Sequence, residues 1–191
     1  MNKRFLTSLA VGAFALAATA ARATIILPLD PDHTSASFTV SHLTITKVTG
    51  QIPLLTSNIV LGNDHIPTAV TATLDASKID THDAKRDKDL RSDHWFDVET
   101  FPTITFRSAK IHRLNKSDFT IDGTLTLHGI TKPVTLAATY TGSAKDPWGY
   151  THFGFNATGS IDRTAFDVGH APAALVGDDV TIELQVEAIK K

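Results

Sequence analysis

His42 is the first residue whose position suggests binding chemistry. It follows Phe38 and Val40 at intervals of two residues, so the three side chains are expected on one face of a strand. An imidazole at the end of an apolar face can donate a hydrogen bond to a carbonyl or a phosphate. The alternative is a core histidine that bonds to the backbone or to a neighbouring side chain. The sequence leaves both roles open.

Arg163 is the second such residue. It lies at the start of a long connection, residues 162–179, between two strand-like runs. A guanidinium can bind a phosphate or another polar head group through parallel hydrogen bonds, so Arg163 is predicted to lie near a head group. The alternative is a structural ion pair with a nearby aspartate, such as Asp162 or Asp167.

The other residues capable of catalysis or metal binding form no recognisable motif. The remaining histidines are His33, His65, His82, His94, His112, His128, His152 and His170. They include no i,i+4 pair on a helix and no HExxH sequence, and the chain has no GxSxG motif. It also has no cysteine, which excludes a thiol nucleophile, a zinc–thiolate site, a covalent c-type haem and a lipoprotein anchor. We therefore predict no catalytic residue, no metal and no cofactor.

Most of the chain is predicted to form β-strands. About eight runs alternate between apolar and polar residues: 33–43, 47–61, 68–74, 104–106, 119–127, 134–140, 153–161 and 180–188. One segment, residues 81–91, has a helical pattern, with Thr81 as its expected cap and a charged, solvated face. Because one helix cannot cover so much sheet, the strands must bury their apolar faces against one another, as a sandwich or a closed barrel.

The inward faces of such a barrel decide whether it is filled or hollow. A barrel of eight strands either packs its own side chains inside or holds one small ligand. Small residues such as Gly50, Gly123 and Gly159 alternate with large apolar ones, so we expect an apolar cavity. Its predicted lining residues are Phe38, Val40, Ile104, Phe106, Leu125, Leu136, Phe155 and Leu184. A collapsed core and an outer-membrane barrel with its apolar face outward are the alternatives.

The helix and the residues after it are predicted to cover one end of the sheet. Leu90, Trp95 and Phe96 would then turn inward as a lid near the barrel mouth. Pro102 suits the start of the next strand, because no ladder donor is needed there.

The first 23 residues have the features of a secretory signal peptide. A basic start precedes a mostly apolar run, and cleavage is expected after Ala23. An uncleaved anchor is the alternative, although the run is short for a membrane span of ~20 residues. Residues 24–191 would form one domain. Because the leader contains three of the 18 basic residues and none of the 20 acidic ones, this domain is acidic, which argues against a nucleic-acid partner.

Four stretches together resemble the YceI family of secreted polyisoprenoid-binding proteins. They are residues 32–42 (DHTSASFTVSH), 90–106 (LRSDHWFDVETFPTITF), 123–134 (GTLTLHGITKPV) and 161–166 (IDRTAF). The resemblance implies an all-β, lipocalin-like antiparallel up-and-down barrel in the bacterial periplasm. Its apolar lumen would take an isoprenoid such as a ubiquinone or a polyprenyl phosphate, and no catalysis is implied. The sequence departs from the family at residues 94–96 (HWF), where a small residue or proline more usually precedes two phenylalanines.

We therefore expect a periplasmic protein that sequesters or carries an isoprenoid lipid. The apolar set would line the lipid chain, with His42 and Arg163 nearer the head group. Two other functions remain open: an enzyme that acts on a lipophilic substrate with His42 as general acid or base, and an accessory partner of a membrane quinone or redox protein. Transient contact with a membrane or a membrane protein, and a homodimer, also remain open.

Overall fold

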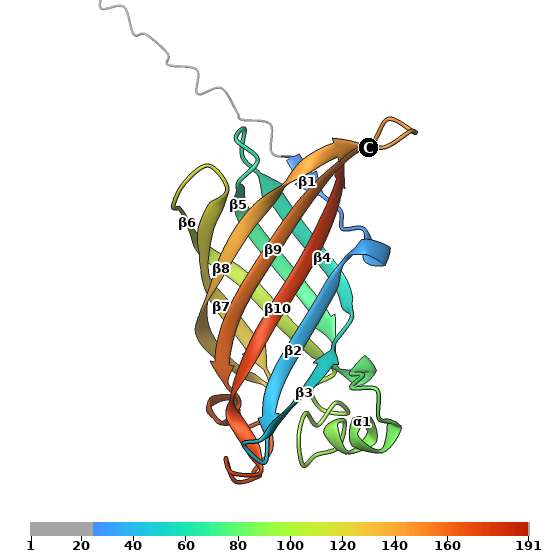
Figure 1. Ribbon diagram of the computed structural model, residues 1–191, viewed down its shortest axis with the longest axis vertical. Helices are drawn as coiled ribbons and strands as arrows, with labels where there is room; N and C mark the ends of the chain where they lie inside the picture. Colours follow the sequence, from blue (N-terminus) through green and yellow to red (C-terminus); the bar gives the residue numbers. More distant parts are fainter. Residues whose placement is uncertain (1–24, 191) are drawn as a thin grey trace, which may run out of the picture.

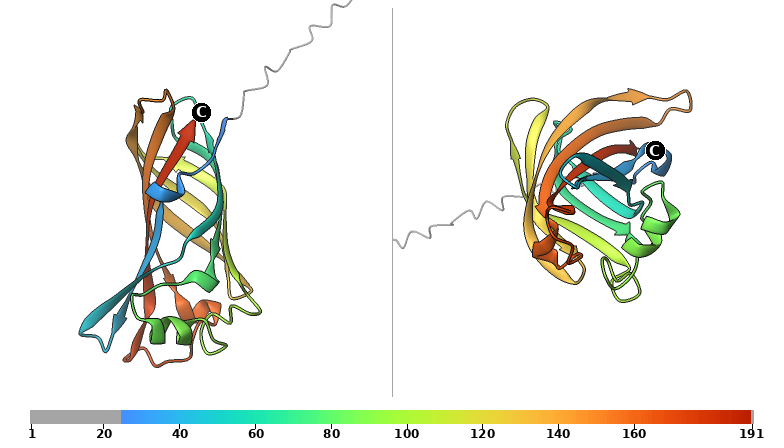
Figure 2. Two further views of the ribbon diagram at one scale, coloured as in Figure 1. Left: turned by 90° about the vertical axis from the view of Figure 1, so that its right-hand side faces the viewer. Right: turned by 60° about the horizontal axis from the view of Figure 1, so that its bottom comes forward.

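The computed structural model describes residues 25–190, so the predicted signal peptide, residues 1–23, lies outside the described residues. Ten strands form one antiparallel sheet in the order β1-β4-β5-β6-β7-β8-β9-β10-β2-β3. Their bounds are β1 Ile25–Leu27, β2 Ser35–His42, β3 Thr46–Gln51, β4 Leu54–Leu61, β5 Pro67–Asp75, β6 Thr103–Arg113, β7 Asp118–Leu127, β8 Ile130–Lys145, β9 Thr151–Asp162 and β10 Val176–Lys190. The sheet curls around a central axis (Figures 1 and 2). The predicted all-β antiparallel barrel is therefore confirmed.

The structure has two strands more than the eight predicted. The run 47–61 is divided into β3 and β4 at Ile52 and Pro53, because a proline nitrogen has no hydrogen to donate to a ladder. β1 has three residues and precedes the first alternating run. Such a short strand offers too few alternating positions to be recognised from one sequence.

Residues 28–30, which follow the edge strand β1, contact β10 and so join two distant strands of the sheet. Leu29 forms an antiparallel bridge with Ala188. The N–H group of Asp30 donates to the carbonyl of Glu187 at 2.8 Å. Because Ala188 is fully buried, this contact closes the barrel wall over part of its core.

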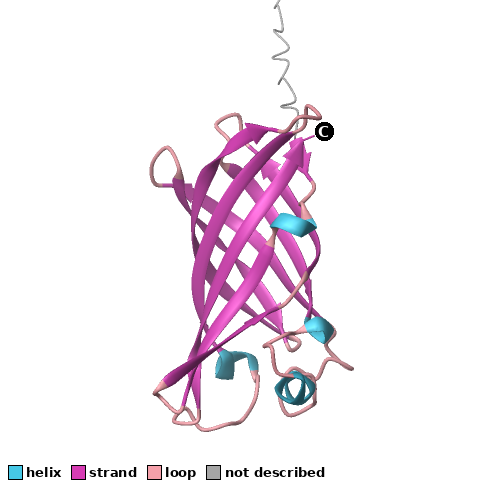
Figure 3. Ribbon diagram, turned by 45° about the vertical axis from the view of Figure 1, so that its right-hand side comes forward, coloured by secondary structure: helices cyan, strands magenta, loops and turns pink. Residues whose placement is uncertain are grey.

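Three short helices lie at one end of the barrel, and a fourth lies beside its wall (Figure 3). They are η2 (Ala76–Lys78), α1 (Ala84–Leu90) and η3 (Arg163–Phe166) at the end, and η1 (Pro31–His33) at the wall. α1 confirms the predicted helix, but its cap is Asp83, which accepts from the N–H groups of Lys85 and Arg86 at 3.0 and 3.1 Å. Thr81 is buried instead. Within residues 25–190, no helix has the length and apolar character needed to cross a membrane.

Aromatic side chains pack together at the end of the barrel opposite α1. The ring of His65 lies 5.5 Å from that of Tyr140 and 5.4 Å from that of Phe153, both in edge-to-face geometry. The ring of Tyr140 lies 5.5 Å from that of Phe155. Phe119, on β7, is only 1% exposed. These rings form a packed aromatic group at this end of the barrel.

Candidate functional site

A cavity of about 460 Å³ lies inside the barrel. Every strand from β2 to β10 contributes side chains to its wall, as do α1 and the residues after it. Most of these side chains are apolar. The polar and charged exceptions are Ser37, Ser41, His42, Ser57, Arg86, Asp89, Asn156 and Arg163. This volume falls within the ~300–1,000 Å³ of typical small-molecule sites, and the wall suits an apolar ligand.

All ten residues predicted from the sequence lie on the wall of this one cavity. They are Phe38, Val40 and His42 of β2, Ile104 and Phe106 of β6, Leu125 of β7, Leu136 of β8, Phe155 of β9, Arg163 of η3 and Leu184 of β10. The strand residues meet there because alternate side chains of each strand point to the same face of the sheet. For the nine strand residues, contact with a ligand remains a prediction.

Large side chains lie over the glycines of the inner face. A Cβ atom at Gly50 would overlap the ring of Phe38, and a Cβ atom at Gly123 would overlap the ring of Phe106. A leucine side chain covers Gly159 in the same way. The predicted apolar cavity is present, although the space directly over these glycines is filled by large side chains. Because large side chains lie across the glycines, against the wall, the centre of the barrel stays open.

The segment after α1 covers one end of the cavity, as predicted for a lid. Leu90, Trp95 and Phe96 all reach the cavity wall. The indole Nε1 of Trp95 donates to Asp89 Oδ2 at 3.0 Å. Gly169 has a φ angle of +68°, and a Cβ atom there would overlap the indole ring, so this position favours glycine for two reasons. Trp95 thus packs α1 against the connection between β9 and β10.

His42 lies at the end of β2, where the cavity approaches this lid. Its side chain reaches the cavity wall, and the residue is half-buried. Within residues 25–190, no group hydrogen-bonds to its ring, so it is not the satisfied core histidine that the sequence also allowed. An imidazole always has at least one N–H donor, which is therefore available to a ligand at this position.

Arg163 is 3% exposed, and the protein itself occupies its guanidinium. Nε donates to the carbonyl of Gly177 at 3.0 Å, and Nη2 donates to Asp178 Oδ1 at 2.9 Å. The other acceptors are the carbonyls of Val168, Gly169, Ala171 and Val176. An arginine has five N–H donors, so none is left for the predicted head-group contact. The ion-pair partner is Asp178, and not Asp162 or Asp167.

A buried polar network near the lid was missed from the sequence. The charge pattern predicts Asp87 on a solvated face, yet Asp87 is 8% exposed and accepts from Thr81 N–H and Oγ1 at 2.8 and 2.6 Å. Arg86, whose Nε donates to the same Oγ1 at 2.7 Å, reaches the cavity wall. Arg91 donates to the carbonyl of Ile79 at 3.3 Å. The spacing of Thr81 and Asp87 is the only local signal, and it is too common to be diagnostic.

Comparison with known proteins gives consistent matches. Residues 28–188 match the family model described as a YceI-like domain. A UPF0312 protein of Vibrio vulnificus (strain YJ016) is 36% identical over 162 residues, 83% of each chain. The Campylobacter jejuni YCEI protein has a TM-score of 0.70 at 23% identity and covers 95% of this chain and 99% of its own. A polyisoprenoid binding domain from Saccharophagus degradans has a TM-score of 0.58 at 13% identity and covers 85% of this chain and 97% of its own.

Proposed function

Because the chain belongs to the YceI-like family, we propose that it binds an isoprenoid lipid in the barrel cavity and carries this lipid unaltered. The related fold of the Saccharophagus domain, named as polyisoprenoid binding, supports the proposal. We also propose that the protein acts in the periplasm, a location for which the predicted leader is the supporting feature.

The main support is the shape and polarity of the cavity. Aromatic rings pack at one end of the barrel, apolar side chains form the cavity wall, and His42 lies at the other end without a partner among the described residues. A hydrocarbon chain fits the wall, because each buried CH₂ group gains about 0.8 kcal/mol. One five-carbon isoprene unit would gain about 4 kcal/mol before the costs of ordering, so a few units suffice for tight binding. The lipid tail would point to the aromatic end and the head group to His42.

The polar end offers two kinds of contact for the head group. A quinone carbonyl needs one hydrogen-bond donor, which the ring of His42 supplies. A phosphate binds more tightly when a cation is also present. Among the described residues, two arginines lie on the cavity wall, Arg86 and Arg163, and the connection between β9 and β10 encloses only Arg163. Arg86 is therefore the charged donor proposed for a phosphate. The proposed head group is therefore a quinone or a polyprenyl phosphate.

Exposed apolar side chains beside this end of the barrel suit contact with a lipid surface. Leu43, Ile45 and Leu175, here called the apolar tip, are 48%, 79% and 44% exposed. The N–H group of Leu43 donates to the carbonyl of Leu175 at 2.9 Å, which holds the two loops together. Their neighbours His42 and Val176 line the cavity. We propose that the apolar tip touches the membrane while lipid is taken up or released.

We propose a carrier in preference to an enzyme. General acid–base catalysis by His42 would gain from a second group that orients its ring or that it activates. Within residues 25–190, no carboxylate and no hydroxyl group hydrogen-bonds to this ring. The bound lipid is therefore expected to leave with its chemical structure unchanged.

Mass spectrometry of an organic extract tests the proposal. The protein is exported with its own leader, purified without detergent and extracted, and one isoprenoid per chain is the expected result. The mass identifies the head group as quinone or phosphate and shows whether the lipid was altered. If the extract is empty and stays empty after incubation with ubiquinone and with undecaprenyl phosphate, the binding proposal is wrong.

A further inference from the structure

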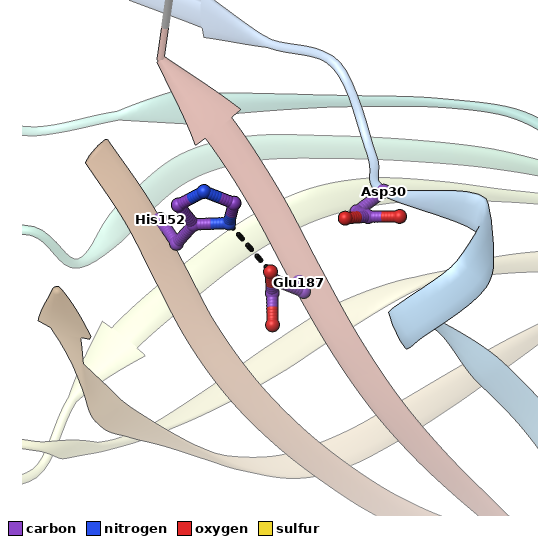
Figure 4. A group of neighbouring side chains, drawn as sticks. All are labelled: Asp30, His152 and Glu187. Atoms are coloured by element: carbon purple, nitrogen blue, oxygen red, sulfur yellow. Dashed lines mark hydrogen bonds and ion pairs between the residues drawn. The ribbon is translucent and has the colours of Figure 1, made fainter. Parts of the chain in front are cut away.

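Three side chains that can ligate a metal meet on the outer surface of the barrel, towards the end opposite α1. Asp30 precedes η1, His152 lies on β9 and Glu187 lies on β10 (Figure 4). One ligand atom from each side chain lies within 4.8 Å of the other two. Because the next residue on β9, Phe153, is buried and Val186 lines the cavity, His152 and Glu187 lie on the outer face.

A second carboxylate holds the His152 ring in the orientation of a metal ligand. Nδ1 of His152 lies 2.6 Å from Glu187 Oε1, and Nε2 lies 3.1 Å from Asp146 Oδ2. The other oxygen of Asp146 accepts from the N–H groups of Trp148 and Tyr150, both at 2.9 Å, which fixes the carboxylate. Metal-binding histidines characteristically present one nitrogen to the metal and donate the other N–H to such a carboxylate.

His33 is positioned to complete the set of ligands. Its Nδ1 lies 2.9 Å from Asp30 Oδ2 and 4.0 Å from Glu187 Oε1. Its side chain is 65% exposed, so the ring can turn without disturbing the core. Two imidazole nitrogens and two carboxylate oxygens would then surround one point.

The backbone holds these residues together without a metal. The N–H group of Asp30 donates to the carbonyl of Glu187 at 2.8 Å, and the N–H group of Glu187 donates to Thr34 Oγ1 at 3.1 Å. His152 and Glu187 lie on neighbouring strands, where Glu187 pairs with Gly154 and His152 with Ile189. The spacing of the ligands is thus set by the closure of the barrel.

We propose that Asp30, His152 and Glu187 form a binding site for a divalent transition metal of the zinc class. Imidazole nitrogen and carboxylate oxygen are ligands that Zn²⁺ accepts, with bonds of about 2.0–2.2 Å, and His33 is the fourth ligand. The metal takes the place of the proton between His152 Nδ1 and Glu187, and that proton passes to solvent. The other N–H of His152 stays directed at Asp146. A bound ion would join residues 30–33 to β9 and β10.

Zinc titration of the tag-free protein with a competing chelating dye tests this site. We expect one Zn²⁺ per chain and a higher melting temperature with zinc than with a chelator. His152→Ala and Glu187→Gln are each expected to raise Kd at least tenfold, because a ligand is lost. Asp146→Asn is expected to weaken binding by about tenfold, because the ring loses its orienting partner.

His112→Ala is the matched control. His112 Nε2 lies 3.0 Å from Asp122 Oδ2, so it is also a surface histidine paired with a carboxylate, and it belongs to no group of three ligands within residues 25–190. Its zinc affinity should equal that of the wild type. A wild type that binds no zinc, or affinities that are equal in wild type, His152→Ala and Glu187→Gln, would overturn the proposal. Glu187→Gln preserves side-chain shape, and circular dichroism of each variant separates loss of the site from loss of the fold.

Discussion

The guanidinium of Arg163 lies beside the ring of Trp95, with its Cζ atom 5.8 Å from the ring centroid. Trp95 belongs to the segment after α1, and Arg163 begins the connection that leads to β10. The contact therefore joins the two segments that cover the polar end of the cavity, at a distance where a cation is attracted to an aromatic face. Arg163 organises this end of the cavity, and its backbone acceptors depend on it.

Arg163→Lys is expected to lower the free energy of unfolding by about 3 kcal/mol or more, because several buried carbonyl groups lose their donor and a lysine cannot replace the planar guanidinium. Urea unfolding measures the change. Arg113→Lys is the control, since the Arg113–Asp64 pair is exposed and worth about 1 kcal/mol at most. Equal losses in the two variants would show that the contacts of Arg163 are not structural.

Val40→Asp is expected to abolish retention of the lipid, because a carboxylate on the apolar wall would lose its water when the tail enters. Lipid per chain in the organic extract is the measurement. Thr39→Asp places the same charge on the adjacent residue, whose hydroxyl bonds to Thr49 on the outer face, and should retain the lipid. A folded Val40→Asp variant with full lipid content would contradict the assignment of the cavity.

His42→Phe is expected to raise the Kd for the lipid about five- to tenfold, which corresponds to one hydrogen bond of about 1 kcal/mol. His42→Gln keeps a donor and should restore part of the affinity. Fluorescence titration with a short-chain quinone and with a short polyprenyl phosphate measures both variants. His94→Phe, at an exposed position, is the control. If both substitutions of His42 leave Kd unchanged, the head group does not bind there.

Ile45→Glu is expected to slow lipid transfer from anionic vesicles several-fold, because a charge on the apolar tip opposes contact with the membrane. The amount of lipid bound at equilibrium should not change, since Ile45 lies outside the cavity wall. Leu114→Glu alters a leucine of similar exposure, 65%, just after β6, at the end away from α1. Equal transfer rates in the two variants would argue against the tip as the membrane contact.

Asp83 is expected to give α1 a pH-dependent stability. The hydrogen bond from the N–H group of Arg86, followed by that from Lys85, holds the pKa of Asp83 below its ordinary value of 3.8. Because the folded-state pKa is lowered, the ionised form stabilises the fold above about pH 4, and this contribution is lost as pH falls through the folded pKa. Asp83→Asn should therefore lower the urea midpoint at pH 7, and its difference from the wild type should shrink as pH falls below about 4. Asp93→Asn, at an exposed site, should leave the midpoint unchanged across this range.

The parts of the fold that sequence reasoning recovered are those that depend on local periodicity. A strand repeats every two residues whatever its partners are, so the alternation of Phe38, Val40 and His42 was enough to place all three on one wall. The same argument placed the apolar residues of five other strands. It could not place β1, whose three residues are recognisable as a strand only from their pairing with β4.

The parts that were missed depend on contacts between distant residues. Arg163 has the local character of a head-group ligand, and only the course of the following connection shows that backbone carbonyls occupy it. Side chains from neighbouring strands fill the space over the glycines, and no local pattern shows this. Likewise, Asp30, His152 and Glu187 are far apart in the chain, so no spacing rule for metal ligands brings them together.

The rings of His65, Tyr140 and Phe153 pack at the end opposite α1, and none of the three lines the cavity. In the proposed binding mode, the end beside His42 is therefore the route by which lipid enters and leaves. A lipid that enters tail first would then leave head first by the same route. An incoming lipid could not displace the bound lipid from the other end, so binding would have to wait until the bound lipid dissociates. Exchange of one cargo molecule for another should therefore be first order, at a rate that does not depend on how much of the replacement is present.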